Sequence, residues 1–88
     1  PRRVRGLSRR KERLARDEAM LFLFDRPDEV AIWMRDTWIP LGVSFFAPDG
    51  KVTATYDMPV EPDPSLAETH YPSRGDVVAA LEYSPEHY

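Results

Sequence analysis

Short runs of apolar, β-prone residues separated by turn residues make up most of the chain after residue 19. Each run is four to seven residues long, which is a typical length for a strand and short for a helix. Several short strands in close succession are typical of an all-β or β-rich sandwich or barrel. The predicted strands cover residues 20–24, 30–34, 43–46, 51–56 and 77–83.

The pattern inside the runs predicts how the strands are covered. Residues 20–24 read MLFLF and are apolar at every position, which favours a strand buried on both faces. Residues 51–56 instead alternate between polar and apolar, with Val52 on the apolar face, so this strand is expected to be half exposed. The pair Asp49-Gly50 lies between two β-prone runs and is the strongest hairpin signal in the chain.

The segments outside these runs predict one short helix and an irregular stretch. Leu7 and Leu14 are seven positions apart and share one face of a helix, for which Ser8 is a suitable N-cap. Residues 58–75 contain several prolines and show no periodicity, which predicts an irregular crossing segment. The patterns together predict a mainly β (β-rich α+β) antiparallel sandwich or barrel with a short N-terminal helix.

The composition fits one small globular domain over residues 1–88. The chain is 42% hydrophobic and 31% charged, and its length has room for a single core. It has no cysteine, which excludes disulfides, thiolate metal ligands and a cysteine nucleophile. No stretch approaches the roughly 18 apolar residues of a membrane-spanning helix. Any targeting segment would precede Pro1, so the sequence predicts no cellular compartment.

The charge is divided unevenly along the chain. Residues 1–16 hold eight Arg or Lys and one acid, a net charge of +7, whereas residues 17–88 hold four bases and fourteen acids, a net charge of −10. The basic head has no interleaved aromatic residues to stack on bases, and the acidic body repels a polyanion. We therefore expect the head to pair with the body of its own chain. Contact of the head with nucleic acid or an anionic membrane is the disfavoured alternative.

Seven sequence boxes occur together in the order of a known family. They read RGLSRR, DEAMLFLF, IWMRDTWIPLGVSFF, DGKV, DMP, YPS and ALEY. In these boxes the chain resembles the family called domain of unknown function 192. The matching positions are Gly6, Leu7, Met20, Leu21, Phe22, Phe24, Trp33, Met34, Thr37, Pro40, Leu41, Phe45, Asp49, Gly50, Met58, Pro59 and Glu82.

The resemblance implies a small jelly-roll-like β sandwich with a short helix near its start, and it implies no activity. The chain departs from the family pattern at three positions: Ala19 replaces glycine, Asp36 replaces asparagine, and Gly42 replaces the aspartate after Pro-Leu. The family usually has a further strand before the first box and another after the last. We therefore expect that residues 1–88 lack the first and last strands of the family domain. Sheet edges exposed in this way predict a homodimer.

The most distinctive polar cluster of the sequence predicts a binding site. Between two tryptophans, the chain places an arginine, a carboxylate and a hydroxyl, and an irregular loop supplies a histidine and a tyrosine. Indole rings stack on apolar or flat ligand faces, and the fork of an arginine accepts a carboxylate. We therefore predict a non-enzymatic module that binds a small ligand or a protein partner. The predicted site residues are Trp33, Arg35, Asp36, Thr37, Trp38, His70 and Tyr71.

Three alternatives compete with this interpretation. In the first, the two tryptophans only pack, and Arg35 and Asp36 only stabilise a turn. In the second, a hydrolase-type enzyme pairs Asp36 or Asp57 with His70, although the chain has no nucleophile elbow or phosphate loop and no catalytic residue is predicted. In the third, methionines and a histidine bind a soft metal; methionines inside apolar runs more often fill a core, so neither a metal nor a cofactor is predicted. The methionines concerned are Met20, Met34 and Met58.

Overall fold

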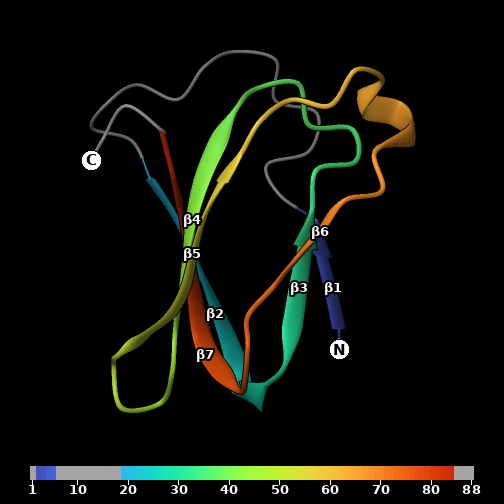
Figure 1. Ribbon diagram of the computed structural model, residues 1–88. Coiled ribbons are helices and arrows are strands. Elements are labelled where there is room, and N and C mark those ends of the chain that lie inside the picture. The colour runs from blue at the N-terminus through green and yellow to red at the C-terminus, as the bar shows by residue number, and fades with distance from the viewer. Residues whose placement is uncertain (1, 6–18, 85–88) are drawn as a thin grey trace.

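A computed structural model describes residues 2–5 and 19–84 of the chain (Figure 1). Within these residues the fold is mainly β, as predicted, with seven strands and one short 3-10 helix. No helix of this part of the chain is long and apolar enough to cross a membrane. The elements are β1 (Arg2–Arg5), β2 (Ala19–Asp28), β3 (Val30–Trp33), β4 (Leu41–Phe46), β5 (Val52–Met58), η1 (Pro64–Leu66), β6 (His70–Pro72) and β7 (Val77–Tyr83).

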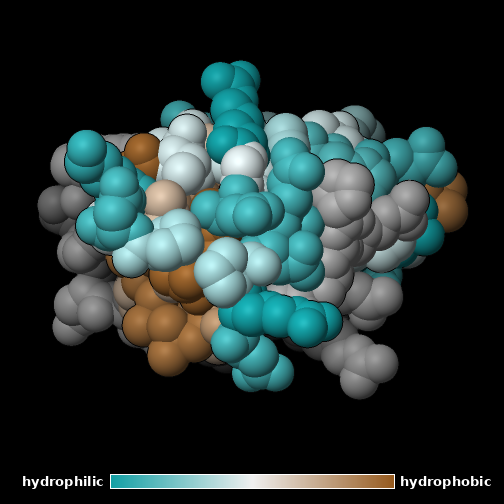
Figure 2. Space-filling model, turned by 90° about the horizontal axis from the view of Figure 1, so that it is seen from below, coloured by the Kyte–Doolittle hydropathy of each residue, from teal (hydrophilic) through white to brown (hydrophobic). Residues whose placement is uncertain are grey.

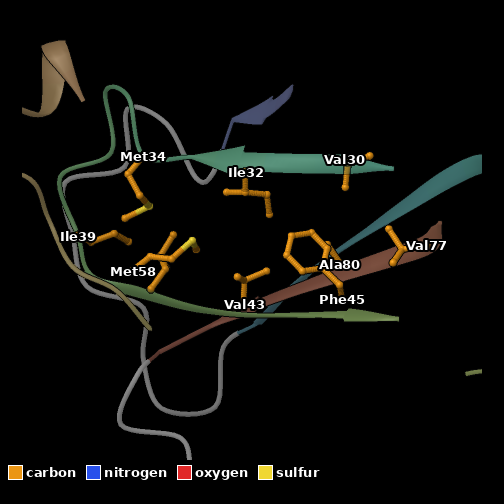
Figure 3. Close-up of a cluster of buried hydrophobic side chains, with 10 residues drawn as sticks. Val30, Ile32, Met34, Ile39, Val43, Phe45, Met58, Val77 and Ala80 are labelled. Carbon is orange, nitrogen blue, oxygen red and sulfur yellow. The ribbon is translucent and has the colours of Figure 1, made fainter. Parts of the chain in front are cut away.

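The strands form two sheets that face each other across the core. One sheet has the order β1-β3-β6, in which β1 is parallel and β6 antiparallel to β3. The other has the order β2-β7-β4-β5 and is antiparallel throughout. Figure 3 shows side chains of β3 reaching toward those of the second sheet. The buried cluster consists of Val30, Ile32, Met34, Ile39, Leu41, Val43, Phe45, Met58, Val77 and Ala80.

The predicted hairpin is confirmed. Gly50 has a positive φ of 85° and donates its N–H to the Ala47 carbonyl at 2.8 Å, which closes the turn between β4 and β5. The register shifts between Phe45 and Phe46, whose partners are Ala54 and Val52. This bulge leaves Val52 54% exposed, whereas the alternating pattern alone predicted it on the buried face.

The prediction that residues 20–24 are buried on both faces is wrong. Leu21 and Leu23 of β2 are 55% and 74% exposed, while Phe22 and Phe24 pack against the core. The reason is the layering: the described strands form only two sheets, so the face of β2 that points away from the opposite sheet has no further layer of described residues over it. Figure 2 views the molecule from below, and most of the hydrophobic surface visible there is gathered in one area.

Side chains of β5 join the edges of the two sheets. The Tyr56 hydroxyl donates to the Pro72 carbonyl at 2.6 Å, and the Thr53 hydroxyl donates to the Ser73 carbonyl at 2.6 Å. Pro72 is the last residue of β6 in the three-stranded sheet, and Ser73 directly follows it. These contacts satisfy edge groups that otherwise recruit a further strand.

A buried serine connects the start of β3 to the segment after β6. Ser73 is 0% exposed; its hydroxyl accepts the Val30 N–H at 3.1 Å and donates to the Gly75 carbonyl at 2.7 Å. The Ser73 N–H also donates to the Val30 carbonyl at 2.8 Å. Ser73 therefore fixes the corner at which the chain passes between the two sheets.

Two of the described strands were not predicted, and one predicted element lies outside the described residues. Residues 2–5 form β1, where the sequence predicted no strand, because β3 offers them a parallel partner. Residues 70–72 form β6, although Pro72 and the short length hide this strand from pattern analysis. The predicted helix that starts after Ser8 lies outside the described residues.

Candidate functional site

An aromatic and cationic cluster lies where β3 meets β6. Trp33 and His70 are cross-strand partners, and their rings stack with centroids 5.5 Å apart and an interplanar angle of 23°. The Arg35 guanidinium carbon lies 4.4 Å from the centroid of the Trp33 ring, which is within the range of a cation–π contact. His70 is exposed, and Trp33 and Arg35 are half-buried. We call Trp33, Arg35 and His70 the stacked cluster.

A tight turn after β3 places Arg35 over the tryptophan. Thr37 donates its N–H to the Met34 carbonyl at 3.0 Å, and Asp36 has a positive φ of 58°. Asp tolerates this left-handed conformation better than most residues do. The Thr37 side chain is 0% exposed and its hydroxyl donates to the Arg35 carbonyl at 3.4 Å, so it supports the turn from inside.

The loop that contains η1 docks against this turn. The Asp36 N–H donates to the Pro64 carbonyl at 2.8 Å, and Arg35 Nε donates to the Ala67 carbonyl at 3.2 Å. Pro64 and Ala67 are themselves buried. Two polar contacts on buried carbonyls therefore hold Arg35 in place, in addition to its contact with the indole.

Glu61 holds the same loop from the other end. Its Oε1 accepts the Glu68 N–H at 3.4 Å, and Glu68 N belongs to the peptide unit whose oxygen, on Ala67, accepts Arg35 Nε. One peptide group is thus fixed at its oxygen by an arginine and at its nitrogen by a carboxylate. No local signal in the sequence pointed to this role of Glu61 or to the Ala67 carbonyl.

Tyr71 lies apart from the stacked cluster. Tyr71 follows His70 in β6 and pairs with Ile32 of β3. Because neighbouring residues of a strand point to opposite faces, its side chain packs against the core. Its ring contacts the Tyr56 ring edge-on at 5.4 Å. Burial, together with the negative charge of Glu61, raises the pKa of the Tyr71 phenol above its ordinary value.

The structure thus brings together some of the predicted site residues and separates others. Arg35 and His70 both contact Trp33, and Asp36 donates its backbone N–H to the docked loop. Thr37 is fully buried and therefore inaccessible to a ligand. Trp38 is 44% exposed and follows the turn in the sequence. The cluster that is available to a ligand is therefore smaller than the predicted set.

The alternative acid–base and metal sites find little support in the described part of the chain. There, no hydrogen bond or ion pair joins His70 to a carboxylate, and its ring is engaged with Trp33. Residues 2–5 and 19–84 contain no group of three or more His, Asp or Glu side chains arranged to hold a metal. Met34 and Met58 are in the buried core, whereas Met20 is 38% exposed on β2.

Two further features were not predicted as sites. A mostly apolar hollow of about 240 Å³ is lined by Pro40, Asp57, Met58 and Pro59, where β5 ends. Glu82 of β7 is 0% exposed, and its partners in the neighbouring strands are Met20 and Val43. A glutamate between apolar residues of a strand is the signal in the sequence for such a buried carboxyl group.

The basic head, which was expected to pair with the acidic body, falls largely outside the described residues. Only its first strand is described, and there Arg5 is in register with Trp33 across the parallel pair β1–β3.

Comparison with known proteins identifies a family and two structural relatives. The model of the family DUF192, described as "Uncharacterized ACR", matches residues 1–87. No curated protein matches the chain. A protein of unknown function from Novosphingobium aromaticivorans has 35% sequence identity and a TM-score of 0.76, over 93% of this chain and 60% of its own. A protein from Sinorhizobium meliloti, provisionally described as a transcription regulator, has 33% identity and a TM-score of 0.74, over 90% of this chain and 57% of its own.

The chain spans less than two thirds of the length of both relatives. The family match nevertheless extends over nearly the whole chain, and both structures share its fold. This chain therefore belongs to the DUF192 family, whose function is unknown.

Proposed function

We propose that this domain is a non-enzymatic binding module and that its ligand, a small molecule or a segment of a protein, contacts the stacked cluster. The observation that carries the proposal is the fixed position of Arg35 against Trp33, with His70 stacked on the same indole. A cation that lies over a half-buried indole, beside an exposed imidazole, offers a ligand hydrogen-bond donors next to aromatic side chains.

The way in which Arg35 is held supports binding more than it supports fold stability alone. A surface arginine that serves only solubility keeps its side chain in water and mobile. Arg35 is half-buried, and it is oriented by one carbonyl and one indole, both of which come from elements that are fixed by other contacts. Side chains that are ordered before the ligand arrives lose less entropy on binding.

The chemistry of the cluster supports binding more than catalysis. General acid–base work needs a titratable group within hydrogen-bond reach of a second group that orients it. His70 stacks on Trp33, and among the described residues it has no carboxylate partner. The aromatic and cationic groups remain, and these recognise ligands without reacting with them.

A fluorescence titration tests the proposal. Peptide and glycan panels are added to the Trp38→Phe protein, in which Trp33 is the only tryptophan, and the emission is followed. We expect a saturable change for at least one compound class. Arg35→Ala should weaken binding by at least about tenfold, since a charged hydrogen-bonding group typically contributes 1.5–3 kcal/mol.

The matched control is Arg26→Ala, which removes the same charge from an exposed position on β2. It should leave the affinity unchanged within about twofold. An emission that never saturates with any compound, or an equal loss of affinity in both arginine variants, contradicts the proposal.

A further inference from the structure

We infer that the ligand of the stacked cluster is a monocarboxylate with a flat or apolar body, and that the terminal Nη groups of Arg35 hold its carboxylate. This inference rests on the proposed function and names the class of ligand.

The orientation of Arg35 determines which of its donors face a ligand. The guanidinium is a rigid fork of five N–H donors, and the Nε donor is committed to the Ala67 carbonyl at 3.2 Å. The two Nη groups make no hydrogen bond or ion pair with any described residue. A pair of parallel donors at the end of a fixed plane matches the two oxygens of a carboxylate.

The peptide group that anchors Arg35 is itself fixed. Its oxygen accepts Arg35 Nε, and its N–H donates to Glu61. The neighbouring Pro64 carbonyl accepts the Asp36 N–H at 2.8 Å. The fork is therefore held by a closed ring of contacts between the turn after β3 and the η1 loop. We infer that Glu61 is a positioning residue, which acts on the ligand through the Ala67–Glu68 peptide.

The aromatic pair beside the fork specifies the body of the ligand. The Trp33 and His70 rings stack at 23°, and Arg35 lies over the Trp33 ring, so the three side chains form one stacked group with a half-buried indole and an exposed imidazole. An aromatic or aliphatic group attached close to a carboxylate can rest against the exposed side of this group while the carboxylate meets the Nη groups. A polar sugar body makes less use of the stacking area.

The acidic surroundings of Arg35 favour a ligand with a single negative charge. The described residues hold seven Arg or Lys, including the three arginines of β1, and eleven Asp or Glu, a net charge of −4. Three of these acids, Glu61, Asp63 and Glu68, are in the loop that docks on Arg35. A phosphate dianion or a polyanion is repelled more strongly than a monocarboxylate, because the Coulomb energy scales with the charge. This favours a free acid or the C-terminus of an uncharged or basic peptide.

Paired acids and amides test the class of ligand. N-acetylphenylalanine, 3-phenylpropionate and the primary amide of each are titrated into the ¹⁵N-labelled 88-residue protein. The Arg35 Nε–H and Trp33 indole signals are followed by heteronuclear NMR. We expect both acids to shift these signals saturably. Each amide should bind at least about tenfold more weakly than its acid. Tighter binding of N-acetylphenylalanine than of 3-phenylpropionate indicates a peptide end, and equal binding indicates a free acid.

Conservative variants locate the effect. Arg35→Lys keeps the charge but loses the two-pronged geometry, so it should reduce acid binding to the level of the amides, while Arg26→Lys should change nothing. Glu61→Gln keeps an acceptor for the Glu68 N–H and should retain binding, whereas Glu61→Ala should weaken acids more than amides. The NMR spectrum of each variant shows whether it is folded.

The outcomes separate this inference from the proposed function. Equal affinity of acid and amide at Trp33 overturns the carboxylate class and leaves a binding module. Equal shifts at Arg26, Lys51 and Arg35 indicate unspecific anion contact and overturn the inference. If none of the four compounds shifts the signals of the stacked cluster, the carboxylate inference and the proposed binding function both lose their support.

Discussion

Replacement of Ser73 by alanine should destabilise the domain far more than the loss of one hydroxyl suggests. Ser73 is 0% exposed, and its hydroxyl both accepts from Val30 N at 3.1 Å and donates to the Gly75 carbonyl at 2.7 Å. Alanine removes both contacts and leaves the N–H of Val30, itself 0% exposed, in an apolar environment. A buried donor without a partner costs about 1–3 kcal/mol, and the second hydrogen bond adds about 1 kcal/mol.

The expected loss of unfolding free energy is therefore about 2–4 kcal/mol. This is a large part of the roughly 5–15 kcal/mol that a domain of this kind has. Urea unfolding followed by far-UV circular dichroism measures the loss as a shift of the midpoint at unchanged slope.

Ser65→Ala is the matched control, because Ser65 is exposed and its hydroxyl donates to Asp63 at 2.7 Å, with no other bond to the described residues. Its effect should stay within about 0.5 kcal/mol of zero. If Ser73→Ala is as stable as Ser65→Ala, the corner between β6 and β7 does not depend on the buried hydroxyl, and the reasoning is refuted.

Three further predictions concern single positions. Because the pKa of Tyr71 is raised in the folded state, its contribution to stability is intact below about pH 10 and is lost as the pH rises from the unfolded pKa through the folded pKa. Tyr71→Phe should therefore flatten the alkaline fall of the melting temperature. An unchanged fall contradicts the assignment to Tyr71. An added Cβ on Gly42 would lie 2.5 Å from the Tyr83 ring, so Gly42→Ala should lower the free energy of unfolding in urea by about 1–3 kcal/mol. In the Tyr83→Val background, where the ring is absent, Gly42→Ala should cost less. Equal stability of Gly42→Ala and wild type contradicts the packing. Leu23 is 74% exposed on β2, so Leu23→Lys should leave stability within about 0.5 kcal/mol and lower any self-association seen by light scattering, whereas a large loss of stability shows that this side chain is covered.

The sequence pattern predicts a strand best where local chemistry decides its position. The hairpin follows from Asp49-Gly50, because glycine adopts the positive φ that the turn requires. Residues 77–83 form a strand with the predicted bounds. In contrast, an apolar run such as residues 20–24 does not encode whether its strand is covered on one face or on both, so its exposed face was missed.

The candidate site was predictable in its residue types but not in its geometry. Trp33 and Arg35 are close in sequence, and an arginine beside an indole suggested a binding surface. His70 is 37 positions from Trp33, and only the pairing of β3 with the unpredicted β6 places it there. The anchor of Arg35 is the backbone carbonyl of Ala67, and a backbone atom leaves no mark in the residue pattern. Tyr71 was grouped with His70, although neighbouring residues of a strand face opposite sides.

In the proposed complex, the ligand carboxylate meets Arg35 while the ligand body lies against Trp33. Intermolecular nuclear Overhauser effects between N-acetylphenylalanine and the protein report this geometry. We expect contacts from the ligand ring to the Trp33 indole and His70 ring protons, and their loss in Arg35→Lys. Contacts only to other surfaces, or the same contacts at the same affinity in Arg35→Lys, contradict it.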